Sequence, residues 1–293
     1  MRITILGTGA MACLLGARLA GVAEVSLVGT WAEGVTALRQ HGVRVEAGAG
    51  SVVVPVRAVL ADEPTPPADL VLVVVKAWQT PSAALQLPGR LAPEGVALTL
   101  QNGLGNLEQL GPRACLGVTT MGATLLGPGQ VRPGGDGPTH IAGPRWLGEV
   151  FERAGLEAHT VAPGQVDSLL WGKLAVNCAI NALTALLRVP NGELLARPDA
   201  AAVMDEAATE CAAVARARGI PLPFADAAAQ ARRVAAHTAN NRSSMFQDIL
   251  RGAPTEIDAI NGAVAQAGAR LGVAVPVNTT LWRLVRALAR AGA

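Results

Sequence analysis

Residues Arg2–Gly21 read RITILGTGAMACLLGARLAG, and this stretch decides the class of fold. Its apolar beginning, Arg2–Leu6, predicts a buried strand, and its second half predicts a helix. Between them, Gly7, Gly9 and Ala12 match the pattern G-x-G-x-x-G/A of dinucleotide-binding turns. In such a turn the first glycine permits a tight bend, the second lets a pyrophosphate approach the backbone, and the helix N-terminus offers amide donors. The candidate cofactor contacts in this turn are Gly7, Thr8, Gly9, Ala10, Met11 and Ala12.

Apolar runs farther along the chain predict the other strands of an α/β domain. The run Leu70–Val75 is apolar throughout, as in a central parallel strand that is buried on both faces. Lys76 follows this run and Asn102 follows the next strand, so both lie at the carboxyl edge, where open α/β sheets bind ligands. We interpret them as nicotinamide or phosphate contacts, although Asn102 before a glycine also suits a turn. The predicted strands are Glu24–Val28, Val52–Val56, Leu70–Val75 and Val96–Leu100.

The second predicted strand ends in Gly29-Thr30-Trp31, which bears on the choice of cofactor. At this point an NAD-binding domain usually offers an acid to the ribose 2′-hydroxyl, and an NADP-binding domain an arginine. This chain offers neither. The missing acid disfavours NAD, and the Thr30 hydroxyl can donate to a 2′-phosphate, so we expect NADP.

A change in composition predicts where the first domain ends. Gly127–Gly143 is dense in glycine and proline and predicts hairpins that finish the sheet. A helix from near Pro144 to Gly155 and a strand over Leu156–Val161 would close the domain, with the boundary at Pro163-Gly164. We expect an α/β, Rossmann-type dinucleotide-binding domain over residues 1–164 and an all-α domain over residues 165–293.

The stretch Leu169–Leu187, LLWGKLAVNCAINALTALL, predicts a helix that is apolar nearly all round. Lys173, Asn177 and Asn181 follow at i, i+4 and i+8, which places them along one face. A structural polar stripe bonded to a neighbouring domain is one interpretation. However, of the 24 lysines and arginines only Lys76 and Lys173 are lysines. Lysine is a compact cation that can release its proton, so we favour a chemical role for Lys173.

The rest of the second half also has helical periodicity, in alanine-rich stretches such as Ala200–Arg218 and Ala259–Leu271. Ser243 or Ser244 is the expected N-cap of the helix that follows. Thr255 is the expected N-cap of another helix, with Glu256 in its first turn. Asn191 lies in a Pro-Asn-Gly turn and suits either the turn or a ligand. The apolar helical faces fit a homodimer or a closed monomer core equally well.

The bulk composition gives no sign of several other classes of protein. The formal net charge of +2 gives no reason to expect binding to nucleic acid or an anionic membrane. The four cysteines form no CxxC and the four histidines have no ligand spacing, so we expect neither disulfides nor a metal. No run reaches the ~20 apolar residues of a membrane span, and the N-terminal run is too short for a signal peptide. We expect a cytoplasmic protein.

Together these motifs resemble the ketopantoate reductase (2-dehydropantoate 2-reductase) family over essentially the full length of the chain. Their order and spacing are consistent with that family along the whole chain. The matching stretches are the glycine turn from Gly7, KAWQ from Lys76, QNGLG from Gln101, WGKLAVNCAINALTA from Trp171, PNGEL from Pro190, NRSSMFQD from Asn241, TEIDAINGAV from Thr255 and GVAVPVNT from Gly272.

The resemblance implies an NADPH-dependent enzyme that reduces 2-dehydropantoate to (R)-pantoate in pantothenate and coenzyme A biosynthesis. It implies that Lys173 is the proton donor and that Glu256 is its acidic partner near the nicotinamide ribose. The chain departs from the family at Thr30-Trp31, where an arginine for the 2′-phosphate is common. The implied substrate ligands are Lys173, Asn177, Asn181, Asn191, Asn241 and Ser244. The implied cofactor contacts beside the glycine turn are Lys76, Asn102, Ala123 and Glu256.

Two other functions fit the same sequence. One is a related NAD(P)-dependent reductase that acts on a different small-molecule 2-keto acid. The other is a non-catalytic NADP sensor, for which the polar stripe from Lys173 to Asn181 would be dispensable. Fold analogy does not choose between them, because function resides in the site.

Overall fold

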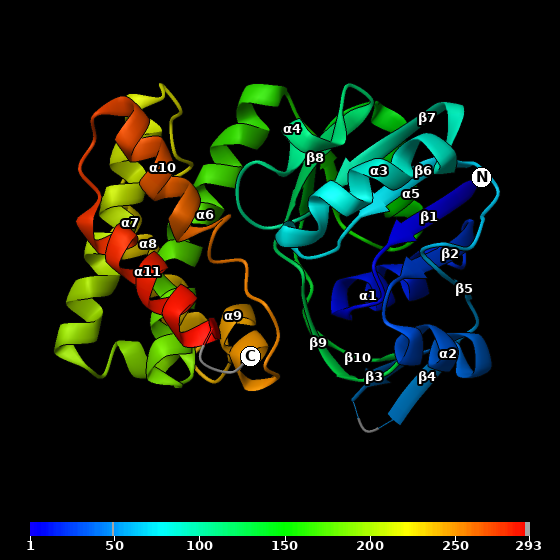
Figure 1. Ribbon diagram of the computed structural model, residues 1–293, viewed down its shortest axis with the longest axis horizontal. Coiled ribbons are helices and arrows are strands. Elements are labelled where there is room, and N and C mark those ends of the chain that lie inside the picture. The colour runs from blue at the N-terminus through cyan, green and yellow to red at the C-terminus, as the bar shows by residue number, and fades with distance from the viewer. Residues whose placement is uncertain (49, 291–293) are drawn as a thin grey trace. The chain divides into compact units, whose positions relative to one another are not determined.

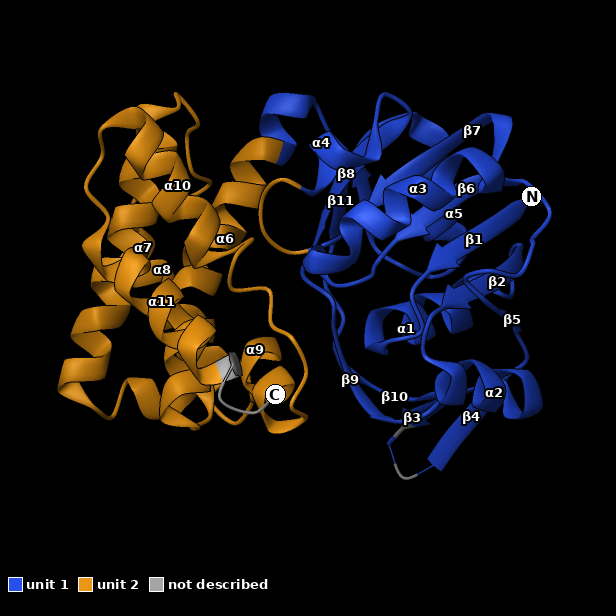
Figure 2. Ribbon diagram, in the orientation of Figure 1, with its two compact units in different colours: residues 1–101, 106–166 blue, residues 102–105, 167–293 orange. Residues whose placement is uncertain are grey.

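The computed structural model describes residues 1–48 and 50–290. The chain forms two compact units (Figures 1 and 2). Unit 1 comprises Met1–Gln101 and Asn106–Val166, and unit 2 comprises Asn102–Gly105 and the chain from Asp167 onward. Unit 1 is α/β and unit 2 is helical, so the predicted fold class is confirmed.

Within the described ranges of unit 1, eight strands form the main sheet in the order β12-β11-β8-β7-β6-β1-β2-β5. The strands from β8 to β5 are all parallel, so their carboxyl ends share one edge. β1 lies between β2 and β6, which places the glycine turn at the middle of that edge. The main-sheet strands are β1 (Arg2–Leu6), β2 (Glu24–Gly29), β5 (Arg57–Leu60), β6 (Ala68–Val73), β7 (Leu91–Thr99), β8 (Ala114–Thr119), β11 (Thr139–Ala142) and β12 (Ala158–Thr160).

A second sheet of four strands, in the order β4-β3-β10-β9 among the described residues, corrects two predictions. The predicted strand Val52–Val56 largely overlaps β4, which pairs with β3 instead of joining the main sheet. Val52 and Val53 are 57% and 47% exposed there. The glycine-rich hairpin β9–β10 also belongs to this sheet, and β11 is the part of the glycine-rich stretch that joins the main sheet, between β8 and β12. The strands are β3 (Val43–Ala47), β4 (Gly50–Val54), β9 (Gly122–Gly127) and β10 (Gln130–Gly135).

Helix α1 (Ala10–Leu19) lies between the two sheets of unit 1. It contacts β2 of the main sheet and β3, β9 and β10 of the second sheet. Its residues Cys13, Leu15 and Leu19 are fully buried in the shared apolar core. The other helices of this unit are α2 (Ala32–His41), η1 (Ala77–Gln79), α3 (Thr80–Arg90), α4 (Asn106–Leu110) and α5 (Arg145–Arg153).

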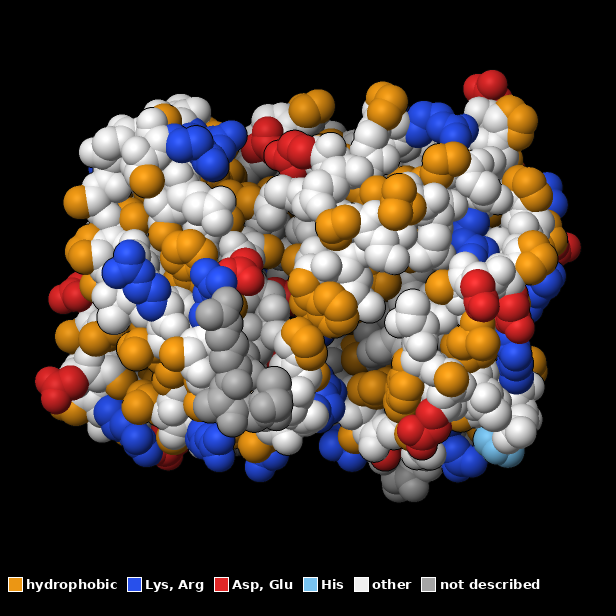
Figure 3. Space-filling view, viewed as in Figure 1, with side chains coloured by type: hydrophobic (Ala, Val, Ile, Leu, Met, Phe, Trp, Pro, Cys, Tyr) orange, Lys and Arg blue, Asp and Glu red, His pale blue; other side chains and the backbone are white. Residues whose placement is uncertain are grey.

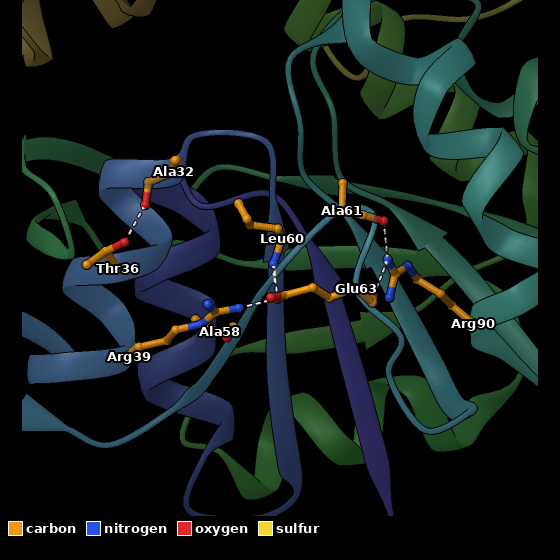
Figure 4. A network of polar contacts seen from close by, with 8 residues as sticks. All are labelled: Ala32, Thr36, Arg39, Ala58, Leu60, Ala61, Glu63 and Arg90. Carbon is orange, nitrogen blue, oxygen red and sulfur yellow. Dashed lines mark hydrogen bonds and ion pairs between the residues drawn. The ribbon is translucent and has the colours of Figure 1, made fainter.

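A polar network fixes the edge strand β5 and the loop after it (Figure 4). The Glu63 carboxylate accepts a bond from the Leu60 N–H at 2.7 Å and pairs with Arg39 of α2. Arg39 also donates to the Ala58 carbonyl at 2.8 Å, and Arg90 donates to the Ala61 carbonyl at 2.7 Å. These bonds hold the outer edge of the main sheet against α2 and α3.

Unit 2 is organised around α6 (Pro163–Leu187), a helix of 25 residues. The predicted helix over Leu169–Leu187 is confirmed, and it begins one and a half turns earlier. Among the described residues α6 has the length and hydropathy of a membrane span, yet 67% of its apolar window is buried inside the protein. It is therefore the core helix of this unit. The other elements are η2 (Asn191–Leu194), α7 (Pro198–Ala217), α8 (Ala227–His237), α9 (Ser244–Leu250), α10 (Asn261–Leu271) and α11 (Pro276–Arg290).

The predicted helix start at Thr255 is wrong, because α10 begins at Asn261. Thr255 Oγ1 accepts only a long bond from the Ile257 N–H, at 3.4 Å. The Glu256 carbonyl accepts from the N–H groups of Ala259 and Ile260, both at 3.1 Å, so the backbone makes one turn and stops. Glu256 thus lies in a tight turn before α10.

Charged side chains of both signs lie on the face that Figure 3 shows. On the face that Figure 3 shows, lysine and arginine side chains are interspersed with aspartate and glutamate. This distribution agrees with the formal net charge of +2.

Candidate active site

The glycine turn in unit 1 has the geometry of a phosphate cradle. Gly7 has φ +133°, and a Cβ there would lie 3.4 Å from the Ala12 Cβ, so the turn is tight against α1. Gly9 is the N-cap of α1 and is exposed, and a Cβ at Gly9 would meet no described atom within 4 Å. The N-cap of this ten-residue helix therefore borders open space, and the first amide groups of a helix have no partner within it. These features fit the pyrophosphate of a dinucleotide.

Lys76 lies at the same edge, after β6. It is the N-cap of η1, and its N–H donates to Gln79 Oε1 at 3.3 Å. The buried Gln101 amide donates to the Val75 carbonyl and to Thr80 Oγ1, both at 2.9 Å. Gln101 thereby braces the segment that carries Lys76.

The end of β2 carries an apolar side chain where cofactor selection is expected. Trp31 is 37% exposed and is the N-cap of α2. A Cβ on Gly34 would come within 2.3 Å of the indole, so Gly34 makes room for the ring. Gly29 similarly makes room for Thr8, since a Cβ there would lie 2.6 Å from the threonine side chain. Ala123, the remaining predicted contact in this unit, is in β9.

The polar face of α6 has the predicted arrangement. Asn181 is buried, and Lys173 and Asn177 are half-buried. The Lys173 ammonium lies deep enough that burial lowers its pKa to about 8, while the negative charge of Glu256 opposes that shift. A buried amine with a carboxylate acting on it can hold a proton near neutral pH and release it.

The loop Asn102–Gly105 brings a third predicted residue to this pair, within unit 2. The Asn102 amide donates to Glu256 Oε2 at 3.4 Å. The Leu104 N–H donates to the Ala259 carbonyl at 2.9 Å. Gly103 has φ +84°, and a Cβ there would lie 2.4 Å from that carbonyl, so only glycine fits. The loop is fixed against the turn that carries Glu256.

The other predicted substrate residues lie around the far end of α6. The Asn191 N–H donates to the Asn241 carbonyl at 3.0 Å, which joins two predicted ligands directly. The buried Asn191 amide donates to Thr238 Oγ1 at 2.8 Å, and its Oδ1 has no partner among the described residues. Ser244 is the first residue of α9 and is half-buried. Ser243 is the N-cap, as one of the two predicted alternatives required.

Sequence reasoning missed Thr184. This buried side chain of α6 donates to Ser243 Oγ at 2.7 Å and so ties α6 to the segment that carries Asn241 and Ser244. Its spacing of three residues from Asn181 places it on the same side of the helix, which was the available signal. Among the described residues, no group of three His, Cys, Asp or Glu side chains is placed to hold a metal.

Two family models match the chain. The model described as "Ketopantoate reductase PanE/ApbA" matches residues 3–145, and "Ketopantoate reductase PanE/ApbA C terminal" matches residues 165–289. A 2-dehydropantoate 2-reductase of Halobacterium salinarum is 39% identical, with all of both chains covered.

Solved structures agree with these matches. A PanE/ApbA family ketopantoate reductase from Ralstonia eutropha JMP134 is 36% identical, covers 100% of this chain and 99% of its own, and has a TM-score of 0.91. A D-mandelate dehydrogenase with NADH and anilino(oxo)acetate is 29% identical, with 100% and 99% covered and a TM-score of 0.89.

A glycine turn at the edge of a parallel sheet, followed by a helical unit with a buried lysine and carboxylate, defines a nicotinamide-dependent oxidoreductase. The family models, the relative and the solved structures identify one family within this class. The chain belongs to the ketopantoate reductase family, an NAD(P)-dependent family of oxidoreductases.

Proposed function

We propose that this enzyme reduces 2-dehydropantoate to (R)-pantoate with NADPH, as a cytoplasmic step of pantothenate and coenzyme A biosynthesis. The observation that carries the proposal is the placement of Lys173 on the polar face of α6, near the Glu256 carboxylate to which Asn102 is bonded, where burial lowers the Lys173 pKa to about 8 and the charge of Glu256 opposes that shift. The names of the relatives support the substrate, and the Thr30 hydroxyl supports the 2′-phosphate.

Lys173 supplies the proton in this mechanism. NADPH, when bound, supplies a hydride to the keto carbon, which leaves negative charge on the oxygen. The Lys173 Nζ stabilises that charge and donates the proton that completes the alcohol. The Glu256 carboxylate keeps the ammonium charged in spite of its burial. Glu256, which accepts a bond from the Asn102 amide at 3.4 Å, would lie near the nicotinamide ribose, and Asn102 would be a further cofactor contact.

The polar groups around α6 bind the substrate. 2-Dehydropantoate has a carboxylate, a ketone and a hydroxyl, so it needs donors and at least one acceptor. The amides of Asn177 and Asn181 and the hydroxyl of Ser244 supply donors. The unpaired, buried Asn191 Oδ1 suits the substrate hydroxyl, because a buried acceptor is stabilised by a donor. Asn241, bonded through its carbonyl to Asn191, completes the set.

The remaining assignments concern unit 1. In this proposal residues 1–164 are the cofactor domain and residues 165–293 the substrate domain. The glycine turn binds the pyrophosphate through its open amide groups. The cofactor contacts are Gly7, Thr8, Gly9, Ala10, Met11, Ala12, Lys76, Asn102, Ala123 and Glu256.

The direct test follows the absorbance of NADPH, and separately of NADH, with 2-dehydropantoate as substrate. Rapid NADPH oxidation with pantoate as the product is the expected result. Folded protein that binds NADPH but turns over with neither cofactor would contradict the proposal and favour a sensor.

A second candidate is reduction of a different 2-keto acid. The observation behind this alternative is a D-mandelate dehydrogenase that is 29% identical to this chain, has a TM-score of 0.89 and binds NADH and anilino(oxo)acetate. A panel of 2-keto acids compared by kcat/KM separates the two. A higher value for an aromatic keto acid than for 2-dehydropantoate would select the second candidate.

A further inference from the structure

A chain of buried hydrogen bonds in unit 2 lies outside the site described above. It begins at Glu210 of α7, whose carboxylate accepts the N–H groups of Val277 and Asn278 at 2.8 Å each. These are the second and third residues of α11, so Glu210 caps that helix. The Asn278 amide donates to Glu210 Oε2 at 2.8 Å and to the Ala207 carbonyl at 3.0 Å.

The chain continues through Asn261, the first residue of α10. Its amide donates to Asn278 Oδ1 at 3.0 Å and to the Cys178 carbonyl at 3.1 Å. Asn261 and Asn278 are both fully buried. The last acceptor is therefore the backbone of α6, in the middle of the stretch that carries the polar face.

Asn261 lies close in sequence to one member of the charged pair and binds the helix of the other. Cys178 follows Asn177 and is five residues from Lys173 in the same continuous helix. Asn261 is five residues from Glu256, and the backbone between them forms the tight turn already described. Only a short stretch of ordered backbone therefore separates the hydrogen bond between Asn261 and Cys178 from each of the two charged residues.

The two polar atoms of the Asn261 amide differ in their hydrogen bonding. Asn261 Oδ1 is buried without a partner among the described residues. A leucine of similar size would bury no such oxygen, but it would take the donor away from Asn278 Oδ1 and from the Cys178 carbonyl. The two directed donor bonds are therefore what an asparagine supplies here and an apolar side chain does not.

We propose that Asn261 is a positioning residue, whose amide ties the turn that carries Glu256 to the helix that carries Lys173 and so fixes the spacing of the two charges. The inference rests on the proposed function for the role of that pair, but its own test needs neither substrate nor cofactor.

The sequence makes a direct test possible, because Lys76 and Lys173 are the only lysines. Protein labelled with carbon-13 at the lysine Cε gives two lysine signals by NMR, and the Lys173→Ala variant assigns them. Glu256 is the charge whose field opposes the burial of Lys173. In Asn261→Leu we expect the Lys173 pKa to fall by roughly half a pH unit, as when a unit charge retreats from about 4 to about 5 Å at an effective dielectric near 20. Asn261→Ser, which is smaller, serves if the leucine variant does not fold.

Glu210→Ala is the matched control. It removes the cap of α11 and lowers the melting temperature, but Asn278 keeps its bond to Ala207 and so keeps its place beside Asn261. We expect the Lys173 titration of this variant to match the wild type. In a Glu256→Gln background, Asn261→Leu should change the Lys173 pKa no further, since the positioned charge is absent.

Two results would overturn the proposal. One is a less stable Asn261 variant with a wild-type Lys173 titration, which would make the residue merely structural. The other is a full pKa shift that persists in the Glu256→Gln background. Failure of the proposed function looks different, since the NMR shift would then appear in a protein that does not reduce 2-dehydropantoate.

Discussion

Two influences act on the pKa of Lys173 in opposite directions. Burial works against its charge, while Glu256 works for it, and the balance sets its pKa at about 8. An arginine would keep its proton in this setting, whereas a lysine can release it, and one of the two lysines of this arginine-rich chain stands here. The residue is charged at neutral pH and can still give up a proton.

Replacing Lys173 tests its proposed role. In Lys173→Ala we expect kcat to fall about 10²–10⁴-fold, the usual contribution of a positioned general acid, with the dissociation constant of NADPH nearly unchanged. Lys173→Arg should fail as well, because a guanidinium does not readily donate its proton. Steady-state kinetics and fluorescence titration of NADPH measure the two quantities. Weakened cofactor binding with unchanged turnover would refute the assignment.

The pH dependence of reduction follows from the same pKa. In the proposed mechanism reduction requires the ammonium form of Lys173, so kcat should fall as the pH rises through about 8. Glu256→Gln removes the charge that raises the Lys173 pKa, so the alkaline limb should move to lower pH. Rate profiles from pH 6 to 10 for both proteins measure this. A limb that stays in place, or moves upward, would show that Glu256 does not act on Lys173.

The sequence predicted part of this residue-scale arrangement. The spacing of Lys173, Asn177 and Asn181 was sufficient, because a helix fixes which residues share a face. Asn261 was not predicted, since its partners Asn278 and the Cys178 carbonyl are far away in the chain. Tertiary hydrogen bonds have no local pattern to reveal them.

At the scale of elements, helix caps show where local sequence suffices. Ser243 caps α9 as expected, because its own hydroxyl accepts the Phe246 N–H at 3.1 Å. Thr255 looks equally suitable but caps no helix. The turn after it lies against Gly103 and Leu104, whose approach to the Ala259 carbonyl is a tertiary contact. The same limit explains β4, where an apolar run alone did not reveal which sheet it joins.

Ser243 caps α9 and also bonds to Thr184 of α6, so Ser243→Ala should have two effects. Loss of the cap and of the bond from Thr184 should lower the free energy of unfolding by about 1–2 kcal/mol. The KM for the keto acid should rise, because the segment with Asn241 and Ser244 loses its tie to α6. Urea denaturation and steady-state kinetics measure the two effects.

Asp226→Ala is the control for that prediction. Asp226 caps α8 by accepting the Ala229 N–H at 2.9 Å, at an exposed site. Its loss should lower stability by about 0.5–1 kcal/mol and leave KM unchanged. If Ser243→Ala and Asp226→Ala both lower stability and neither changes KM, the Ser243–Thr184 bond does not position substrate ligands.

On the scale of the whole molecule, the chain passes between the two units more than once. The segment Asn102–Gly105 follows β7 of the main sheet but belongs to the helical unit, and α6 begins in unit 1 and continues in unit 2. The sequence predicted one boundary, at Pro163-Gly164, which falls in the first turn of α6. It gave no sign of the excursion at Asn102, because four residues are too few for a change in periodicity.

Cofactor preference can be measured on the whole folded protein through its melting temperature. A ligand that binds only the native state raises that temperature. A ligand at one hundred times its dissociation constant raises the free energy of unfolding by about 2.7 kcal/mol. For a chain of this size, that is a rise of several degrees in the melting temperature. The segment after β2 offers the exposed Thr30 hydroxyl and the Glu33 carboxylate but no cation. We therefore expect NADPH to raise the melting temperature more than NADH, by a narrow margin.

Thr30→Arg should widen that margin between NADPH and NADH, since a guanidinium binds a 2′-phosphate in a bidentate manner. Thr36→Arg adds the same charge at an exposed position of α2, six residues after Thr30, and should leave the margin unchanged. Equal widening by both variants would mean that general charge, and not contact at the end of β2, selects the phosphate.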